Sequence, residues 1–252
     1  MKIIITGAGS GLGRDLALIF AAAGHDVIAS DADGETAMET AAIAGGGTSR
    51  MRALTLDVTS DNDVAGLCAA LGDSPVEVLI NNAGLQLVSR LESFPPQRWA
   101  HLVDVMLAGA ARVTAALLPQ MKERNFGRVV NIGSVLSLRG ASFKTAYSAA
   151  KHGLLGFSKS LALETADYDI TINTVCPSFV RTPLMEGQIQ DQAREHGIPE
   201  EDVVRHIMLK PMPKGVFITP EEIAGTIEFL ISPVARNITG EAIALDGGWS
   251  CE

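Results

Sequence analysis

The sequence predicts an α/β fold in which one doubly wound, parallel sheet of seven strands is covered by helices on both faces. Three observations lead to this prediction. Apolar strand-like segments alternate with segments of helical spacing, the strand-like segments are rich in Val, Ile and Leu, and glycine-rich or polar turns follow them. Sheets of this kind often form one unit of about 250 residues, so we expect a single domain spanning residues 1–252.

The expected strands have the length and composition of buried parallel strands. In chain order they are Lys2–Thr6, Val27–Ser30, Arg52–Leu56, Val76–Asn81, Arg128–Ile132, Thr171–Cys176 and Ala242–Leu245. The spacing of apolar residues predicts helices over Leu12–Ala23, from about Arg98 to Asn125, and over Thr145–Ala166. Because ligands bind beyond the carboxyl ends of such strands, the residues that follow each strand are the functional candidates.

One segment interrupts this alternation. Residues 182–214 are polar and contain four prolines between short helical pieces. Long insertions of this kind are usually functional, and this one follows the sixth strand at the expected ligand edge. We therefore interpret it as a helical substrate lid in preference to a surface excursion.

Composition and charge exclude several classes of protein. The chain is 47% hydrophobic and has a net charge of -9, which argues against nucleic acid as a partner. The three cysteines, Cys68, Cys176 and Cys251, match no metal-ligand spacing, so we expect no metal site. The first apolar run is too short for a signal peptide, and we expect no stretch that spans a bilayer. A cytoplasmic protein without a membrane partner is the resulting expectation.

A glycine-rich turn joins the first strand to the first helix, with the sequence Thr6-Gly7-Ala8-Gly9-Ser10-Gly11-Leu12-Gly13. Glycines there let the backbone approach a pyrophosphate, which the N–H groups of a helix N-terminus can bind. The strand–turn–helix context therefore indicates a Rossmann-type dinucleotide site. The residues of this turn that we expect to contact the cofactor are Gly7, Ser10, Gly11, Leu12 and Gly13.

Asp31 ends the second strand, 18 residues after Gly13. A carboxylate at this place accepts hydrogen bonds from the adenosine ribose and repels a 2′-phosphate, and no Arg or Lys stands beside it in the sequence. Capping of the next helix is an alternative role for Asp31, but Asp33 is equally placed for it. We therefore expect the cofactor to be NAD and not NADP.

Further turns follow the third and fourth strands at the same edge. Asp57 is expected to accept a hydrogen bond from the adenine amino group, with Val58 beside it, and Asn81, Ala83 and Gly84 are expected to line the cofactor groove. Each residue alone is an ordinary turn former. Their placement after successive strands favours the cofactor-binding interpretation.

The fifth strand leads into Ser134, and Tyr147 and Lys151 follow on the next helix. Residues four apart lie on one face of a helix, so we expect the lysine ammonium beside the phenol, where it favours the phenolate. Such a tyrosine serves as an acid–base residue, and Ser134 can hydrogen-bond the same substrate oxygen. An isolated Tyr-x-x-x-Lys pair is more often part of an ordinary amphipathic helix.

In combination, these features resemble the short-chain dehydrogenase/reductase family over nearly the whole chain. The matching motifs are Thr6-Gly7-x-x-x-Gly11-x-Gly13, Asn81-Asn82-Ala83-Gly84, Ser134 and Tyr147-x-x-x-Lys151. The resemblance implies that Tyr147 is the acid–base residue and that Ser134 orients the reacting oxygen. It further implies that Lys151 lowers the pKa of Tyr147 and that both residues contact the nicotinamide ribose. A nicotinamide-binding loop and a homotetramer are also implied, the loop residues being Pro177, Val180 and Thr182.

Two positions depart from the family's pattern. Met106 stands where the family usually has an asparagine that helps hold a water in a proton relay, and a thioether cannot donate a hydrogen bond. We expect slower proton release and not inactivity, because the residues that touch the substrate remain. Ser178 replaces the glycine that usually follows Pro177, which is a milder change.

Within the family, the chain resembles the soluble bacterial-type D-3-hydroxybutyrate dehydrogenases in several further stretches. This implies that Gln86, Lys144 and Gln188 hold a substrate carboxylate. Lys144 supports the idea independently, because a cation near a helix N-terminus is opposed by the helix dipole and a bound anion would offset that cost. Leu136 and Phe179 replace a histidine and a tryptophan of those enzymes, so the pocket has lost a polar group and changed shape.

The leading functional hypothesis is reversible oxidation of a small secondary alcohol by NAD, with a 3-hydroxy acid such as 3-hydroxybutyrate as substrate. Reduction of a 3-oxoacyl thioester and oxidation of a neutral alcohol or polyol stay open as alternatives. A non-catalytic NAD-binding sensor is a third alternative, which is motivated by Met106. The joint presence of Ser134, Tyr147 and Lys151 argues against it.

Overall fold

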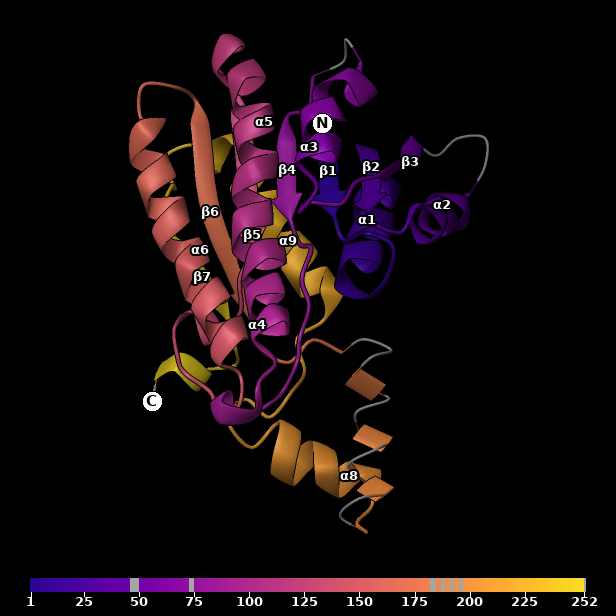
Figure 1. Cartoon of the computed structure of the whole chain (residues 1–252), viewed down its shortest axis with the longest axis vertical. Helices are drawn as coiled ribbons and strands as arrows, with labels where there is room; N and C mark the ends of the chain where they lie inside the picture. Colours follow the sequence, from indigo (N-terminus) through magenta and orange to yellow (C-terminus); the bar gives the residue numbers. More distant parts are fainter. Residues whose placement is uncertain are drawn as a thin grey trace.

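The computed structural model describes residues 1–45, 50–72, 75–181, 185–186, 189–190, 193–194 and 197–251. Seven parallel strands form one sheet in the order β3-β2-β1-β4-β5-β6-β7, which confirms the predicted doubly wound parallel sheet (Figure 1). The strands are β1 (Lys2–Thr6), β2 (Asp26–Asp31), β3 (Met51–Thr55), β4 (Val78–Asn81), β5 (Gly127–Ile132), β6 (Ile170–Pro177) and β7 (Ala242–Leu245). Every predicted strand is present, and its ends move by no more than two residues.

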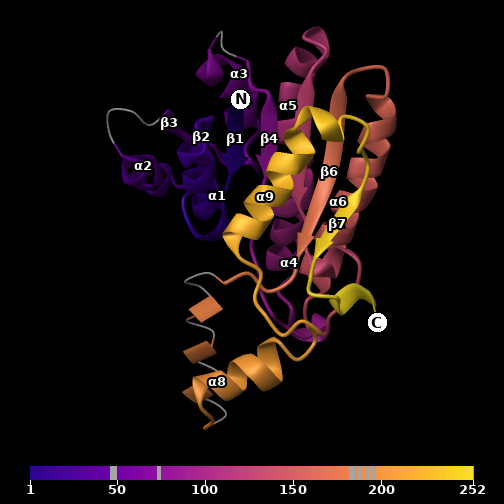
Figure 2. The same ribbon diagram turned by 180° about the vertical axis from the view of Figure 1, so that it is seen from behind.

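Helices cover both faces of the sheet. The views from the two sides show α1 and α9 on one face and α3, α5 and α6 on the other (Figures 1 and 2). Helix α2 packs against β2 and β3. The helices are α1 (Gly11–Ala22), α2 (Gly34–Ile43), α3 (Asp61–Leu71), α4 (Pro96–Val103), α5 (Ala110–Glu123), α6 (Thr145–Glu164), α8 (Glu200–Val203) and α9 (Pro220–Ile231).

The central strand β1 explains why the two faces form separate cores. All five of its residues are buried. Ile3 and Ile5 belong to the apolar cluster under α1 and α9, whereas Ile4 belongs to the cluster under α3, α5 and α6. Side chains alternate between the faces of a strand, so a continuous apolar run is the pattern that a sheet covered on both sides requires.

Three helices that apolar spacing did not single out begin at well-defined caps. The side chains of Asp33, Ser60 and Thr219 accept backbone N–H groups in the first turns of α2, α3 and α9. Such caps satisfy N–H groups that have no partner inside the helix. Local hydrogen bonding therefore sets these starts, and in α2 and α3 it does so where the apolar periodicity is weak.

The long central helix corrects one expectation. Pro96–Glu123 is a continuous helical stretch of 28 residues, made of α4, a π-helical turn (Asp104–Gly109) and α5, and by length and composition it is able to cross a membrane. The expectation that no such stretch exists is therefore wrong. In the fold this helix lies against the sheet, where Val113, Leu117 and Met121 are fully buried. A core position of this kind accounts for the apolar residues on that face.

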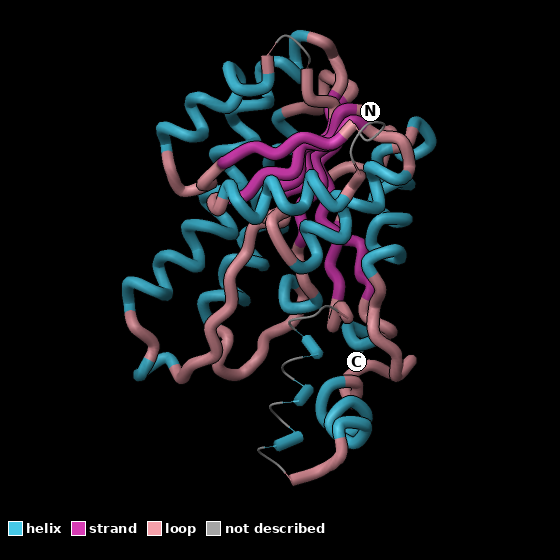
Figure 3. Tube along the Cα trace, turned by 90° about the vertical axis from the view of Figure 1, so that its right-hand side faces the viewer, coloured by secondary structure: helices cyan, strands magenta, loops and turns pink. Residues whose placement is uncertain are grey.

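The segment after β6 leaves the sheet and returns to it. Backbone pairing of Val180 with Ile218 closes its base. Helix α8 and the π-helical turn after it lie beyond the carboxyl ends of the strands (Figure 3). Ile189, Val203 and Met208 form a small apolar cluster of their own there. The described residues of this segment therefore lie at the carboxyl edge, and the role of residues 182–214 as a substrate lid stays a prediction.

A buried ion pair at the opposite, amino end of the sheet generates a stability prediction. Arg128 is 1% exposed, and its guanidinium donates to a side-chain oxygen of Asp169 at 2.9 Å and to the Asp169 carbonyl at 2.8 Å. We expect Asp169→Asn to lower the free energy of unfolding by about 1 to 2 kcal/mol, because the buried cation then has only neutral acceptors. The loss is not larger, because solvent screens the partly exposed carboxylate in the wild type. Urea unfolding followed by circular dichroism measures this change.

The exposed neighbour Asp167, which forms no ion pair within the described part of the chain, supplies the control substitution Asp167→Asn. Equal destabilisation by the two substitutions would contradict the role given to the Arg128 pair.

Candidate active site

The N-terminus of α1 is left open for a ligand. Gly7 and Gly11 have left-handed φ angles of 66° and 52°, and a Cβ on Gly11 would meet no described atom within 4 Å. Ser10 provides no side-chain cap, and the first turn of α1 contains no acidic residue. In contrast with the capped helices described above, the first N–H groups of this helix face open space, which is the arrangement that binds a pyrophosphate.

Hydrogen bonds join this glycine turn to the turn after β4. Thr6 Oγ1 accepts the backbone N–H groups of Asn82 and Ala83, both at 3.1 Å, and Asn82 Nδ2 donates to the carbonyls of Thr6 at 3.0 Å and Gly7 at 3.1 Å. A Cβ on Gly7 would lie only 2.8 Å from Ala83 Cα. The two turns therefore form one surface at the carboxyl edge. Asn82, which sequence reasoning used only as part of a motif, holds this surface together.

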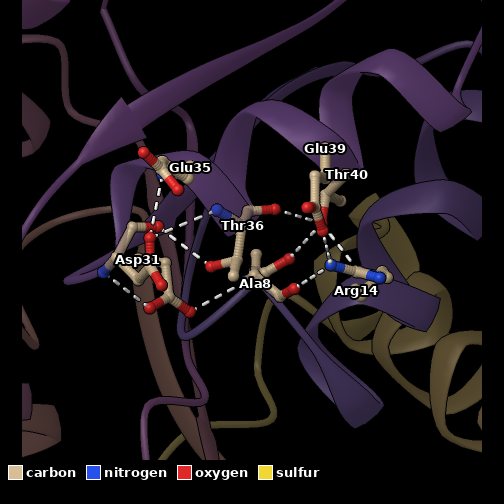
Figure 4. Close-up of polar contacts among 9 residues, drawn as sticks. Ala8, Arg14, Asp31, Glu35, Thr36, Glu39 and Thr40 are labelled. Carbon is tan, nitrogen blue, oxygen red and sulfur yellow. Dashed lines mark hydrogen bonds and ion pairs between the residues drawn. The ribbon is translucent and has the colours of Figure 1, made fainter.

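Asp31 lies at the end of β2 beside the glycine turn (Figure 4). Its Oδ2 accepts the backbone N–H of Gly9 at 2.9 Å, and its Oδ1 accepts that of Asp33 at 3.1 Å. Asp33 caps α2, as the sequence indicated, with its Oδ1 accepting the N–H of Glu35 at 2.9 Å. Each Asp31 oxygen keeps one further acceptor position, so the carboxylate can still receive ribose hydroxyls.

Arg14 lies close to this site although it is distant from Asp31 in the sequence. Figure 4 shows its guanidinium on the far side of the glycine turn, where it donates to the carbonyl of Gly9, to Thr40 Oγ1 at 3.0 Å and to Glu39 at 3.3 Å. These three partners hold Arg14 between α1 and α2. The guanidinium is therefore occupied by these partners, although it stays partly exposed.

Three expected cofactor-binding residues follow β3 and β4, and their contacts with the cofactor stay predictions. Asp57 Oδ1 accepts both the N–H and the hydroxyl of Thr59, at 2.8 and 2.7 Å, which leaves its other oxygen for a ligand. Val58 is buried against the central helix, where a Cβ on Gly109 would lie 2.6 Å from it. Gly84 is exposed at the edge.

Asn81 was expected to line the cofactor groove, and this stays a prediction for its backbone. Its side chain is 5% exposed and points into the protein. Its Nδ2 donates to Asn131 Oδ1 at 2.8 Å and to Thr114 Oγ1 at 3.1 Å. The physical reason is strand register: Asn81 pairs with Asn131 in the neighbouring strand, so the two amides meet inside the sheet.

Ser134, Tyr147 and Lys151 come together at the carboxyl end of β5. Lys151 is buried, donates from Nζ to the carbonyl of Ile132 at 2.5 Å, and holds this nitrogen 5.6 Å from the centre of the Tyr147 ring. Ser134 is also buried, and its side chain lies close enough to Tyr147 to lower the pKa of the phenol. The three groups thus form one cluster, as the sequence predicted from their spacing.

The electrostatics of this cluster differ from the expectation. Burial raises the pKa of Tyr147 above its usual value, and hydrogen bonding to Ser134 only partly opposes this effect. Burial also lowers the pKa of Lys151 to about 8. The expectation of a lowered tyrosine pKa is therefore wrong for the protein by itself. The free energy needed to remove a phenolate from water is larger than the stabilisation that the neighbouring side chains provide.

Met106 occupies the π-helical turn of the central helix. It is 2% exposed and packs in an apolar cluster with Phe94, Leu102, Ala146 and Ala150, and a Cβ on Gly84 would lie 3.6 Å from its sulfur. Tyr147 contacts the same cluster. The position where the family usually has a polar side chain is thus filled by apolar packing beneath the tyrosine.

The residues expected to bind the substrate lie on neighbouring loops. Lys144 directly precedes α6 as its N-cap residue, one position earlier than expected. It is partly buried, which lowers its pKa, and it forms no ion pair within the described ranges. Gln86 is exposed and Leu136 is buried. Gln188 and the nicotinamide-loop residue Thr182 lie outside the described residues.

A strained residue, Phe143, connects the loop of Gln86 with the loop of Lys144, and sequence reasoning did not find it. Phe143 has a left-handed φ of 65°, which is unusual for a bulky side chain. Its carbonyl accepts the N–H of Ser89 at 2.9 Å, and Arg90 lies over its ring at 5.1 Å from the centre. This contact joins the loop that carries Gln86 to the loop that carries Lys144.

Two aromatic side chains, one after β6 and one near the C-terminus, form an apolar wall. Phe179 stacks on Trp249, with ring centres 5.6 Å apart, and Arg139 donates to the carbonyl of Trp249. Pro177 ends β6, and Val180 pairs with Ile218 at the base of the segment that follows. The C-terminal segment therefore completes this wall, which the sequence could not indicate because Trp249 is remote from Phe179 along the chain.

No group of three or more His, Cys, Asp or Glu suited to a metal ion occurs in the described ranges. A groove of about 750 Å³ lies at the other end of the molecule, where Asn125, Lys159, Asp169 and Arg236 are among its lining residues. None of the residues of the serine–tyrosine–lysine cluster lines it. The chemistry is therefore assigned to the carboxyl edge of the sheet.

Comparisons with known proteins agree with this geometry. A family model described as short chain dehydrogenase matches residues 1–193. The D-beta-hydroxybutyrate dehydrogenase of Rhizobium meliloti (strain 1021) is 38% identical over 253 residues, which cover 99% of this chain and 98% of the relative. The protein of the same name from Cupriavidus necator is 37% identical over 249 residues, covering 98% and 96%.

Among solved structures, an actinorhodin polyketide ketoreductase with a Phe-to-Trp substitution, crystallised with NADPH, superimposes with a TM-score of 0.91. It is 32% identical, and the match covers 100% of this chain and 97% of that one. The chain therefore belongs to the short-chain dehydrogenase/reductase family, as an oxidoreductase that acts on CH–OH groups with a nicotinamide dinucleotide.

Proposed function

We propose that this enzyme interconverts a small 3-hydroxy acid, such as 3-hydroxybutyrate, and the corresponding keto acid, with NAD as its cofactor. The observation that carries the proposal is Lys144: a partly buried ammonium at the N-terminus of α6, three residues before Tyr147, without an ion pair within the described ranges. Burial and the helix dipole both disfavour this charge, and a substrate carboxylate would offset both effects. The names of the two relatives point to the same substrate class.

In the proposed reaction, Tyr147 takes the proton from the substrate hydroxyl during oxidation and returns it during reduction. Ser134 donates a hydrogen bond to the same oxygen, and Lys151, oriented by the carbonyl of Ile132, favours the phenolate while its ammonium is charged. The nicotinamide supplies the hydride chemistry when it is bound. Met106 contributes no hydrogen-bond donor, so proton release from this cluster is expected to be slow.

The preference for NAD rests on charge at Asp31. Two backbone N–H groups hold its carboxylate at the edge of the glycine turn, and Arg14 is engaged by Gly9, Glu39 and Thr40. A 2′-phosphate would therefore meet a fixed negative charge without a free cation to offset it. Ribose hydroxyls, in contrast, would find acceptor positions on both Asp31 oxygens.

Reduction of a 3-oxoacyl thioester is the second candidate function, favoured by the close structural similarity to a polyketide ketoreductase. Leu136 and Phe179 also leave the pocket more apolar than a carboxylate site requires. A preference for NADPH and for thioesters would support this alternative. Turnover of neutral alcohols or polyols alone would place the enzyme in a third class, and NAD binding without any turnover would indicate a sensor.

The first test of the proposal is turnover by the purified enzyme with NAD or NADP, followed by absorbance of the reduced cofactor. The substrates are both enantiomers of 3-hydroxybutyrate, their methyl esters, longer 3-hydroxy acids and neutral diols. We expect NAD-dependent turnover of a 3-hydroxy acid, and a fall in kcat of about 10²- to 10⁴-fold for Tyr147→Phe. Tyr168→Phe, at the only other tyrosine of the chain, is the matched control and should retain activity. Retained turnover in Tyr147→Phe would refute the assigned acid–base role.

The second test concerns the carboxylate. We expect Lys144→Ala to raise KM for the 3-hydroxy acid about 10- to 100-fold with little change in kcat, since a charge-assisted hydrogen bond is worth about 1.5 to 3 kcal/mol. Any turnover of the methyl ester should be unaffected. Lys159→Ala removes an exposed lysine from the same helix and serves as the control. An equal loss for acid and ester would show that Lys144 does not recognise the carboxylate.

The third test is the pH dependence of the two directions. Oxidation requires deprotonated Tyr147, and burial raises the pKa of this phenol. The kcat/KM for oxidation should therefore rise from about pH 7 to about pH 9, and kcat/KM for reduction, which needs protonated Tyr147, should fall as pH rises through the tyrosine pKa. Initial rates at saturating cofactor measure both profiles. An oxidation rate that falls across this range would contradict the assignment.

A further inference from the structure

We infer that Ser137 is a positioning residue for the reaction: it fixes Ser134 so that the Ser134 hydroxyl meets the substrate oxygen as a hydrogen-bond donor. The inference rests on the function proposed above, in which Ser134 and Tyr147 share that oxygen. Ser137 is 1% exposed and closes a short 3-10 turn, Val135–Ser137, that directly follows Ser134. Sequence reasoning did not single it out, because the usual capping-box pattern has Glu or Gln at this position, whereas here two serines form the reciprocal box.

The Ser134 oxygen is already engaged as an acceptor. The backbone N–H of Leu136 donates to Ser134 Oγ at 3.1 Å. A hydroxyl has one proton and two acceptor positions, so a backbone donor on the oxygen directs the proton toward a different acceptor. The Ser134 side chain lowers the pKa of Tyr147. This is the effect expected of a hydroxyl that donates a hydrogen bond to the phenolate oxygen.

Ser137 holds the turn that brings the Leu136 N–H to this oxygen. Its Oγ accepts the backbone N–H of Ser134 at 3.1 Å, and its own N–H donates to the Ser134 carbonyl at 2.8 Å. Both groups are buried, so removing the Ser137 hydroxyl would deprive the Ser134 N–H of this acceptor in a place that water reaches poorly. The turn would relax, and Ser134 Oγ would no longer be held in one orientation.

The Ser137 side chain is itself held from strand β6. It lies beside the thiol of Cys176, which is fully buried, and lowers the pKa of that thiol. Gly133 allows this approach, because a Cβ there would lie 2.9 Å from both Ser137 Oγ and Cys176 Sγ. The serine turn is thus fixed against two adjacent strands, β5 and β6, and not only by its own backbone. Precise placement of a donor is what a positioning residue contributes to rate.

The experiment compares Ser137→Ala with the wild type in the oxidation of 3-hydroxybutyrate by NAD, or of whichever alcohol of the panel is turned over. We expect kcat to fall about tenfold, the order of effect seen for residues that orient a reacting group, with a smaller change in KM. The rise of kcat/KM with pH should move to higher pH, because the hydrogen bond that lowers the pKa of Tyr147 is weakened. Ser137→Thr keeps the hydroxyl and should recover part of the loss.

Two further variants make the result specific. Ser148→Ala removes a buried hydroxyl one residue after Tyr147 that has no hydrogen-bond partner in the described part of the chain, so it should leave kcat and the pH profile unchanged. Ser134→Ala shows how far kcat falls when the donor is lost completely. Titration with NADH gives the fraction of folded, binding-competent enzyme in each preparation.

The outcomes separate this inference from the proposed function. Suppose that Ser134→Ala inactivates the enzyme, whereas Ser137→Ala has a kcat within about twofold of the wild-type value and the same pH profile. The positioning role of Ser137 is then wrong. A loss in Ser137→Ala with an unshifted profile and no recovery in Ser137→Thr indicates a purely structural residue and also overturns it. If Ser134→Ala itself stays active, the role of Ser134 fails and the inference for Ser137 fails with it. If the wild type turns over no 3-hydroxy acid with NAD, the proposed function fails, and Ser137 is then tested on whichever alcohol is turned over.

Discussion

A chain of buried polar side chains across the middle of the sheet holds the reacting helix in place. Asn81 donates to Asn131 at 2.8 Å, Asn131 donates to Ser158 at 2.9 Å, and Ser158 hydrogen-bonds Thr174 at 2.8 Å, so that β4, β5, β6 and α6 are joined in one network. Apolar packing alone tolerates small shifts of a helix along a sheet, whereas buried hydrogen bonds require one register. Because α6 carries the tyrosine and the lysine of the cluster, this network sets their position relative to Ser134 at the end of β5.

Burial is the second constraint, and it acts on three titratable groups near the reacting helix. It raises the pKa of Tyr147, lowers the pKa of Lys151 to about 8 and lowers the pKa of Lys144. The dry environment that strengthens electrostatic contacts with ligands thus disfavours charge in the protein by itself. Under the proposed function, the carboxylate of the substrate stabilises Lys144, and oriented donors such as Ser134 stabilise the phenolate. Binding and reactivity are then coupled through desolvation.

Much of this could be predicted from residue patterns, and the failures have identifiable causes. The strands and the glycine turn were predictable because apolar runs and turn residues are local signals. The direction of the Asn81 side chain was not, because it depends on which strand becomes the neighbour and in which register. Whether the apolar residues of Pro96–Glu123 pack in a core or face a membrane likewise depends on the sheet beside them. The pKa of Tyr147 depends on burial, which spacing along one helix does not report.

The sequence by itself determined the doubly wound sheet, the edge at which ligands bind, and the cluster of Ser134, Tyr147 and Lys151, because periodicity and helical spacing act over short stretches of chain. Only the tertiary structure decided how that cluster is supported. The strain at Phe143 and the stack of Phe179 on the C-terminal segment join residues far apart in sequence. Contacts of this kind arise from the packing of whole elements, and no local pattern encodes them.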